Sequence, residues 1–193
     1  MKQIAVFASG NGSNAQRLAE YFDQTNHAKV TAIYCNNPKA FVIQRAESLN
    51  IPLVLFNREQ LCNDDSFVLN DLKSRNINLI VLAGFLWLMP QTIIKAYQGR
   101  IINIHPALLP LYGGKGMYGS KVHESVISNG DRQSGITIHL VDEVYDNGEV
   151  LFQATCPVTP ADTPDSLAHK IHELEYKYFP EVVDDYLSGP LYK

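Results

Sequence analysis

Residues 4–15 of the chain read Ile-Ala-Val-Phe-Ala-Ser-Gly-Asn-Gly-Ser-Asn-Ala. The first five, Ile4–Ala8, are apolar throughout, which is the pattern of a strand buried on both faces of a parallel sheet. A glycine-rich turn follows and leads to a run of helical spacing, a helix that we expect to be capped by Ser13 or Asn14 and to run to about Gln24. The stretch therefore predicts a strand, a glycine loop and a helix, the opening unit of an α/β fold.

Strands and helices continue to alternate through the first half of the chain. Short runs rich in β-branched and aromatic residues are separated by segments of helical spacing. We expect strands at residues 30–35, 53–56, 79–83 and 100–104, and helices at residues 40–49, 64–75 and 90–97. This order predicts a parallel sheet with right-handed crossovers and helices on both faces.

The second half is organised differently. Residues 106–119 are rich in Pro and Gly and are expected to form a long loop, and long loops in compact domains are often functional. Residues 136–141 and 149–155 predict two strands that pair antiparallel at the edge of the sheet. The predicted fold is a Rossmann-like α/β architecture: a mostly parallel sheet, helices on both faces and an antiparallel addition in the C-terminal part.

Two helices complete the expected structure. The first covers residues 121–128, and the second covers residues 166–187 with a kink at Pro180. We expect one domain over the whole chain, with a phosphate-binding half at residues 1–104 and a second half at residues 105–193 that carries the long loop and the last helix.

Composition narrows the class of protein. The 193 residues are 46 % hydrophobic and 19 % charged, with a net charge of −4, and no Lys/Arg cluster of the kind that binds nucleic acid occurs. No apolar run approaches the roughly 18 residues that a membrane span needs, and the three cysteines have no metal-ligand spacing. We therefore expect a cytoplasmic protein with reduced thiols, small-molecule ligands and no nucleic-acid or membrane partner.

The glycine loop after the first strand is a candidate anion site. Free amide groups and the dipole at a helix N-terminus attract phosphate. Gly10, Gly12 and Ala15 also match the dinucleotide pattern G-x-G-x-x-A, but that pattern needs a carboxylate after the second strand, where Asn36 and Asn37 stand. We favour a simple phosphate over NAD, and a tight turn without a ligand is the remaining alternative.

Asn103 and His105 form the second candidate site. They alternate along one strand, so both side chains lie on one face at its carboxyl end, and Pro106 then ends the strand. A fixed amide N–H can stabilise the oxyanion of an acyl transfer, and an imidazole can donate or carry a proton. The alternative is a structural pair that is satisfied by backbone contacts.

Asp146 is the third candidate. A buried carboxylate beside His105 would raise the pKa of the imidazole and make it a better acid near neutral pH. Asp146 also precedes Asn147-Gly148, so a role in a turn alone is the other interpretation.

Four segments together resemble the family of phosphoribosylglycinamide formyltransferases, folate-dependent enzymes of purine synthesis within the formyltransferase superfamily. The resemblance covers nearly the whole chain. The Asn-x-His-Pro and Leu-Leu-Pro sequences are typical of the superfamily, and the Gly-Asn-Gly-Ser-Asn loop narrows it to this family. The segments are Ser9–Asn14, Leu82–Phe85, Ile102–Pro110, and His139 with Asp146–Gly148.

The resemblance implies a role for each matching position. The catalytic residues it implies are Asn103, His105 and Asp146. The residues it implies for binding the ribonucleotide substrate are Gly12, Ser13, Asn14 and Glu175. The residues it implies for the folate pocket are Leu86, Trp87, Leu88, Met89 and Asn103. The co-substrate it implies is 10-formyltetrahydrofolate, with no metal, in a monomer or a homodimer.

Several positions depart from the family pattern. Ala107 stands where serine is common, and Trp87 stands where arginine is frequent. A basic folate-contacting residue of some members has no clean match, and Arg58 nearby is given no role. His123 and His172 are expected at the surface or in loops.

Other readings of the sequence remain. A formyltetrahydrofolate hydrolase, a methionyl-tRNA formyltransferase and a sugar formyltransferase share the Asn-x-His-Pro core, although the first two usually carry an extra domain that the length of 193 residues does not accommodate. A non-catalytic nucleotide-binding module would use the glycine loop alone.

Overall fold

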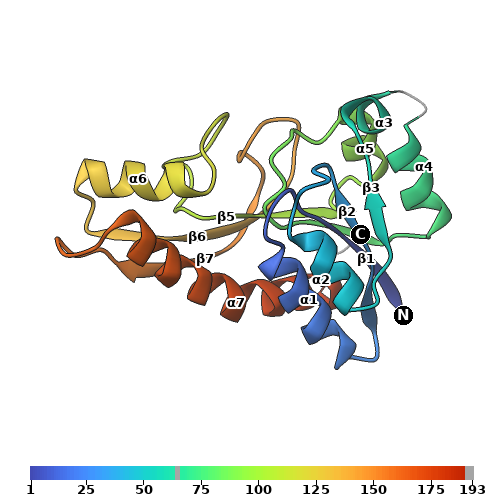
Figure 1. Cartoon of the computed structure of the whole chain (residues 1–193), viewed down its shortest axis with the longest axis horizontal. Helices are drawn as coiled ribbons and strands as arrows, with labels where there is room; N and C mark the ends of the chain where they lie inside the picture. Colours follow the sequence, from blue (N-terminus) through green and yellow to red (C-terminus); the bar gives the residue numbers. More distant parts are fainter. Residues whose placement is uncertain (64–65, 190–193) are drawn as a thin grey trace.

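One seven-stranded sheet organises the chain. The computed structural model describes residues 1–63 and 66–189, and the strands lie in the order β3-β2-β1-β4-β5-β6-β7 (Figure 1). Neighbours from β3 to β5 run parallel, β6 runs antiparallel to β5, and β7 runs antiparallel to β6. The strands are β1 (Lys2–Phe7), β2 (Ala28–Cys35), β3 (Leu53–Leu55), β4 (Leu79–Leu82), β5 (Ile101–His105), β6 (Gln133–Leu140) and β7 (Val150–Pro157).

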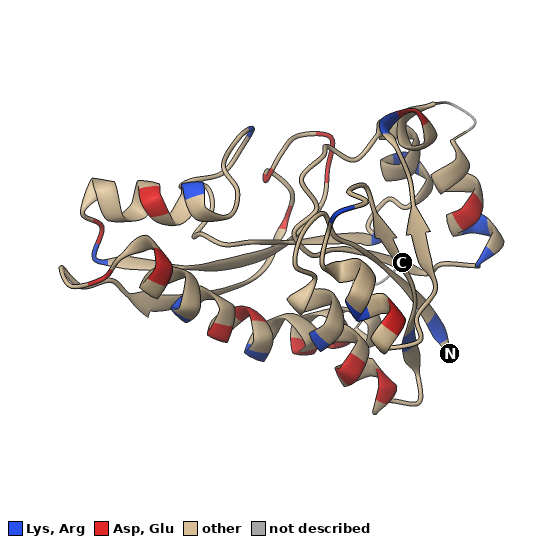
Figure 2. Cartoon of the chain, in the orientation of Figure 1, with Lys and Arg blue, Asp and Glu red and all other residues tan. Residues whose placement is uncertain are grey.

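The helices cover the sheet in two groups. Side chains of the first group belong to one hydrophobic cluster, and side chains of the second group belong to another. The first group is α1 (Ser13–Asp23), α2 (Val42–Ser48), α6 (Ser120–Asn129) and α7 (Pro164–Ser188), and the second is α3 (Arg58–Cys62), α4 (Phe67–Ser74) and α5 (Gln91–Ala96). Charges of both signs alternate along the outer sides of α1 and α7 (Figure 2).

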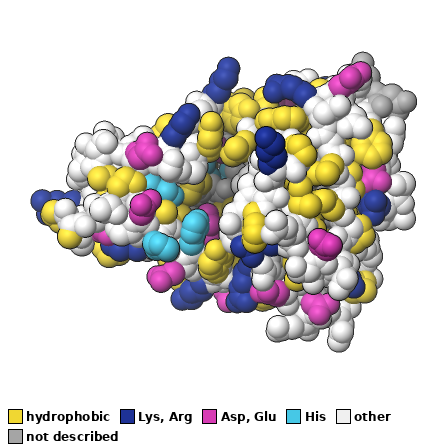
Figure 3. Space-filling view, viewed as in Figure 1, with side chains coloured by type: hydrophobic (Ala, Val, Ile, Leu, Met, Phe, Trp, Pro, Cys, Tyr) yellow, Lys and Arg dark blue, Asp and Glu magenta, His cyan; other side chains and the backbone are white. Residues whose placement is uncertain are grey.

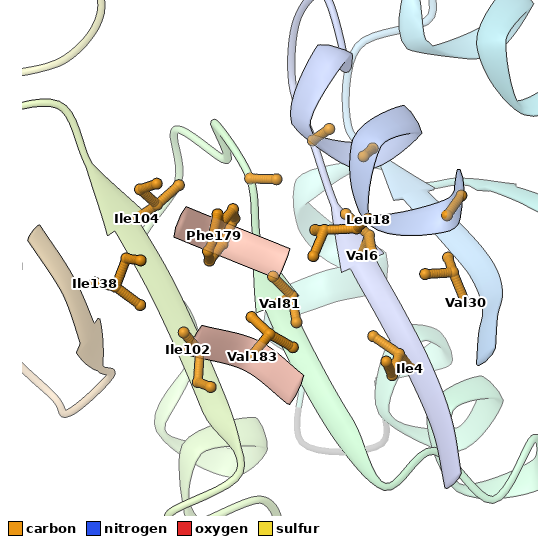
Figure 4. Close-up of a cluster of buried hydrophobic side chains, with 14 of the residues drawn as sticks. Ile4, Val6, Leu18, Val30, Val81, Ile102, Ile104, Ile138, Phe179 and Val183 are labelled. Carbon is orange, nitrogen blue, oxygen red and sulfur yellow. The ribbon is translucent and has the colours of Figure 1, made fainter. Parts of the chain in front are cut away.

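The larger hydrophobic cluster packs α7 against the sheet. Phe179 and Val183 of α7 are fully buried with Val81 of β4 and Ile102 of β5, and Figure 4 shows these side chains together. Burial of a large apolar side chain contributes roughly 1.5–3 kcal/mol, so this helix carries a large share of the core energy. The helix continues through Pro180.

The predicted fold class is confirmed, since the sheet is mostly parallel with an antiparallel C-terminal pair and helices around it. One helix was not expected. α3 begins at a capping box in which Asn57 accepts from the amide of Gln60 and the Gln60 side chain accepts from the amide of Asn57. The helix expected at residues 64–75 is observed as α4, capped by Ser66, and residues 64–65 lie outside the described part of the chain.

Within residues 1–63 and 66–189, no helix is both long enough and apolar enough to cross a membrane.

Candidate active site

A cavity of about 790 Å³ opens at the carboxyl ends of β1, β4 and β5. This edge is where ligands bind in open α/β sheets. Its lining includes the glycine loop, the turn after β4, the end of β5 and the loop before α6. Figure 3 shows the hollow in the middle of this face, with histidine side chains gathered beside it. The volume is typical of a pocket for a small molecule or cofactor.

The N-terminus of α1 faces this cavity without a side-chain cap. The expectation that Ser13 or Asn14 caps this helix was wrong: the helix begins at Ser13, and the cap position is Gly12, whose φ of 75° is left-handed. A glycine adopts this conformation without steric cost. Because no side chain occupies the first amide groups of the helix, they remain available to an anion.

Helix α2 holds the glycine loop from outside the cavity. The amide of Val42 donates to the carbonyl of Gly10, and Arg45 donates from Nη2 to Oδ1 of Asn11 at 2.8 Å. A Cβ at Gly12 would lie 2.5 Å from Cβ of Val42, so only glycine fits there. The loop is therefore shaped before any ligand arrives.

Asn103 and His105 lie on β5 with one residue between them, so their side chains share one face of the strand, as the alternation predicted. In the register of the sheet Asn103 faces His139 and His105 faces Thr137, both on β6. His139 donates from Nδ1 to the carbonyl of Leu140 at 2.8 Å, and its Nε2, which is the acceptor nitrogen of the neutral ring, lies 3.0 Å from Nδ2 of Asn103. His139 therefore fixes the direction of the Asn103 amide.

His105 lies between a carbonyl and a carboxylate. Its Nε2 is 2.7 Å from the carbonyl oxygen of Tyr112, which only accepts, so Nε2 carries a proton. Its Nδ1 is 3.6 Å from Oδ2 of Asp146. Burial lowers the pKa of His105 below its ordinary value, although Asp146 and the Tyr112 carbonyl act to raise it. Asp146 therefore raises this pKa as expected, but the expectation that His105 would favour its charged form was wrong, because removal of the ring from water is the larger effect.

The Asp146 side chain contacts Asn103 and His105 on β5 and the backbone of Gly114 in the long loop. The Asp146 backbone is left-handed, with a φ of 53°, and its side chain is 11 % exposed. Oδ1 accepts a long hydrogen bond of 3.4 Å from Asn103 Nδ2, and Oδ2 accepts one of 2.9 Å from the amide of Gly114. Burial alone would raise the pKa of Asp146, but His139, His105 and the Gly114 amide together lower it. The carboxylate is therefore ionised at neutral pH.

Glu175 lies at the other end of the cavity, beside the glycine loop. It is 6 % exposed, and its Oε2 accepts from Nδ2 of Asn14 at 2.9 Å. Burial raises its pKa to about 7, although the Asn14 hydrogen bond acts to lower it. This carboxyl can change its charge near neutral pH when a ligand binds beside it.

The segment expected to bind folate divides into two pairs. Leu86 and Trp87 line the cavity, and the Leu86 amide donates to Oγ of Ser9 at 3.1 Å, which ties this turn to the glycine loop. Leu88 and Met89 are not among the described residues that line it: Leu88 is exposed elsewhere, and Met89 is buried in the second hydrophobic cluster.

Several cavity-lining residues were not identified as site residues from the sequence, and three of them are charged or titratable side chains near the predicted site. Arg58, at the start of α3, lies over the Trp87 ring at 5.5 Å. His172 on α7 is exposed and lines the cavity, as its expected surface position allows. His123 was expected at the surface but is 4 % exposed between α6 and α7, and burial lowers its pKa to about 4, with a smaller effect from His172. Only the packing of the helices reveals this burial.

Within the described ranges, no group of three or more His, Cys, Asp or Glu side chains is arranged to hold a metal ion.

An amide, an imidazole and a carboxylate thus meet in one cavity beside an uncapped helix N-terminus, an arrangement that suits enzymes of acyl-group chemistry. The model of the formyl transferase family matches residues 2–183, and the chain belongs to this family.

Several of the relatives that the chain resembles share one name. The chain is 37 % identical over 97 % of its length to the phosphoribosylglycinamide formyltransferase of Bacillus subtilis, of which it covers 96 %. It is 40 % identical over 95 % of its length to the chloroplastic phosphoribosylglycinamide formyltransferase of Vigna unguiculata, but it spans only 60 % of that relative and 64 % of the one from Arabidopsis thaliana.

Solved structures agree with these relatives. The phosphoribosylglycinamide formyltransferase of Bacillus halodurans superposes with a TM-score of 0.88 at 31 % identity, with 99 % of each chain covered. The enzyme of the same name from Streptococcus pneumoniae gives a TM-score of 0.84 at 37 % identity, with 97 % of this chain and 99 % of that chain covered.

Proposed function

We propose that this protein transfers the formyl group of 10-formyltetrahydrofolate to the amine of 5′-phosphoribosylglycinamide, giving N-formylglycinamide ribonucleotide and tetrahydrofolate in purine biosynthesis. The observation that carries the proposal is a single cavity that joins the uncapped N-terminus of α1 to Asn103, His105 and Asp146. The names of the relatives support the choice of substrates. A cytoplasmic location fits a reaction between two water-soluble molecules.

The substrate phosphate occupies the glycine loop in this proposal. The amides of Gly12, Ser13 and Asn14 bind it, because they begin a helix that has no side-chain cap. Glu175 accepts hydrogen bonds from the sugar or the glycinamide group. Oδ1 of Asn14 is buried without a partner among the described residues, so it also suits a donor of the substrate.

The amine then reaches the formyl carbon near the end of β5. The protonated form of His105, which is the minor form at neutral pH because burial lowers its pKa, stabilises the developing oxyanion together with an N–H of Asn103. The 3.4 Å contact between Asn103 and Asp146 is the weaker of the two made by the amide, so it is the one that the oxyanion replaces. Asp146 offsets the effect of burial on His105 and orders a water, and this water carries the proton lost by the amine to N10 of the folate. The oxyanion then re-forms the carbonyl, the bond between the formyl carbon and N10 breaks, and tetrahydrofolate leaves.

The folate lies on the other side of the reactive centre, between residues 85–89 and the loop at residues 140–146. Leu86 and Trp87 offer an apolar and aromatic wall to a flat ring system, and Arg58 adds a positive charge at the same wall. Met89 packs in the second hydrophobic cluster with Phe85, and Leu88 has no contact role in this proposal.

A direct assay tests the proposal. The protein is incubated with 10-formyltetrahydrofolate, with and without phosphoribosylglycinamide, and both formyl transfer and formate release are measured. Transfer that depends on the amine supports the proposal, whereas release of formate without the amine favours a hydrolase. Thermal shifts from phosphate ligands alone, with no response to a folate analogue, would favour a nucleotide-binding module.

A further inference from the structure

The backbone of Tyr112 decides which nitrogen of His105 faces the substrate. The Tyr112 carbonyl takes the Nε2–H group of His105 at 2.7 Å. Nδ1 is left on the side of Asp146, at 3.6 Å from its carboxylate, at the edge of the cavity. If this carbonyl moved, the ring could exchange its two nitrogens, and Nδ1 would no longer lie on the side of Asp146 and the cavity.

The position of this carbonyl depends on an unfavourable backbone conformation. Tyr112 has a φ of 54°, which is in the left-handed region. A residue with a Cβ enters this region at a cost in free energy, and such residues persist only when neighbouring contacts hold them. The loop around Tyr112 has glycines at 113 and 114, so its neighbours add little stiffness.

The Tyr112 side chain makes the contacts that hold its backbone in the left-handed conformation. Its hydroxyl donates to Oδ2 of Asp131 at 2.5 Å and accepts from Nδ2 of Asn129 at 2.7 Å. Asn129 is the last residue of α6, and Asp131 follows directly after its glycine cap. The ring packs against the larger hydrophobic cluster. Burial, followed by the hydrogen bond to Asp131, raises the pKa of the phenol, so the hydroxyl keeps its proton and remains a donor.

We propose that Tyr112 is a positioning residue for His105. Its hydroxyl, held by Asn129 and Asp131, fixes the left-handed backbone, and the carbonyl of that backbone keeps Nδ1 of His105 turned toward Asp146 and the substrate. The importance of this orientation for turnover rests on the proposed formyl transfer, whereas the orientation itself does not.

Tyr112→Phe tests the proposal, because it removes the hydroxyl and keeps the ring. We expect kcat to fall about tenfold, less than the roughly 10²-fold cost of a full ångström of misplacement, with little change in KM for either substrate. In the intact protein, the ¹⁵N signals of the His105 ring should change from one Nε2–H form to a mixture of tautomers. The titratable groups that face this ring are Asp146, His139 and His123, and the variant leaves all three in place.

Tyr21→Phe is the matched control. Tyr21 donates to Oδ2 of Asp184 at 2.9 Å, so the variant also removes a tyrosine–aspartate hydrogen bond, but between α1 and α7 outside the cavity. It should leave kcat and the His105 signals unchanged.

If Tyr112→Phe does not fold, Asp131→Asn is a second variant that weakens the hydrogen bond between the Tyr112 hydroxyl and residue 131. It should shift the His105 signals in the same direction and by a smaller amount. Unchanged His105 signals in the Tyr112 variant, or a kcat equal to that of Tyr21→Phe, would overturn the proposal. If the wild type shows no formyl transfer, the proposed function fails, and the ring signals still decide whether Tyr112 orients His105.

Discussion

Nδ2 of Asn14 lies 2.9 Å from Oε2 of Glu175, although 161 residues separate them in the chain. Asn14 is in the first turn of α1, and Glu175 is on α7. This hydrogen bond closes one end of the cavity and brings a buried carboxyl to the edge of the glycine loop. The pair therefore links the expected phosphate site to the rest of the ribonucleotide site.

Glu175 should make stability depend on pH. Its pKa is raised to about 7 in the folded protein, above its unfolded value, so its contribution is present in acid and is lost as the pH rises from about 4.5 through 7. Relative to wild type, Glu175→Gln should therefore gain roughly 2–3 kcal/mol in unfolding free energy between pH 5 and pH 8. Urea unfolding at both pH values measures this change.

Glu173→Gln is the control for this experiment, since Glu173 is exposed on the same helix. Its unfolding free energy should follow wild type at both pH values. Parallel curves for the Glu175 variant and wild type would show that Glu175 titrates normally in the folded protein.

Asp146→Asn should lower the pKa of His105 further, because the carboxylate is the main group that raises it against the effect of burial. The His105 titration seen by NMR should move to lower pH, and turnover at neutral pH should fall by about 10²-fold. Glu149→Gln changes an exposed carboxylate just after this loop and should leave both unchanged. A His105 titration that moves to higher pH would contradict the assigned role of Asp146.

His105→Ala tests the oxyanion role directly. Loss of one donor of this kind costs on the order of 10²–10³ in turnover, so kcat should fall by that factor with the fold intact. His27→Ala, which removes an exposed imidazole beside Asp184, should retain the activity of wild type. Turnover within about tenfold of wild type would remove His105 from the mechanism.

Gly12→Ala should damage both stability and phosphate binding. The added Cβ meets Val42 and the left-handed backbone disfavours alanine, which together cost about 2–4 kcal/mol. Gly10→Ala is the matched control, because a Cβ there meets nothing within 4 Å and the backbone is not left-handed. Thermal unfolding with and without inorganic phosphate compares the two, and equal losses in both variants would argue against the special role of Gly12.

Trp87→Ala should weaken binding of a folate analogue about tenfold, which corresponds to the loss of one aromatic contact. Binding of phosphoribosylglycinamide should be unchanged. Leu88→Ala alters the next residue, which is exposed away from the cavity, and should leave both affinities as they are. Titration calorimetry measures the two ligands separately, and equal effects of the two substitutions would show that the folate lies elsewhere.

The sequence predicted the parts of the fold that depend on local pattern. Fully apolar runs such as Leu79–Leu82 marked the central strands, and strand alternation placed Asn103 and His105 on one face. β6 was expected to begin at residue 136, but it begins at Gln133, because the strand continues through Gly135. A side chain at Gly135 would collide with the Ala154 carbonyl on β7, so the glycine marks close strand pairing and not a break.

The remaining features depend on contacts between distant residues. Asp146 reaches His105 only through the folded chain, and the lowered pKa of His105 results from burial that no spacing reveals. His123 is buried because α6 packs on α7, and Met89 is buried because the turn after β4 folds back onto the second cluster.

The place of Glu175 on the last helix also has a consequence for synthesis on the ribosome. The glycine loop leaves the exit tunnel early, but the residue that faces it is translated about 160 positions later, on the same helix that buries Phe179 and Val183 against the sheet. A nascent chain that stops before α7 would present an apolar sheet face and half a ribonucleotide site. Maturation of the pocket and closure of the core should thus occur as one late event.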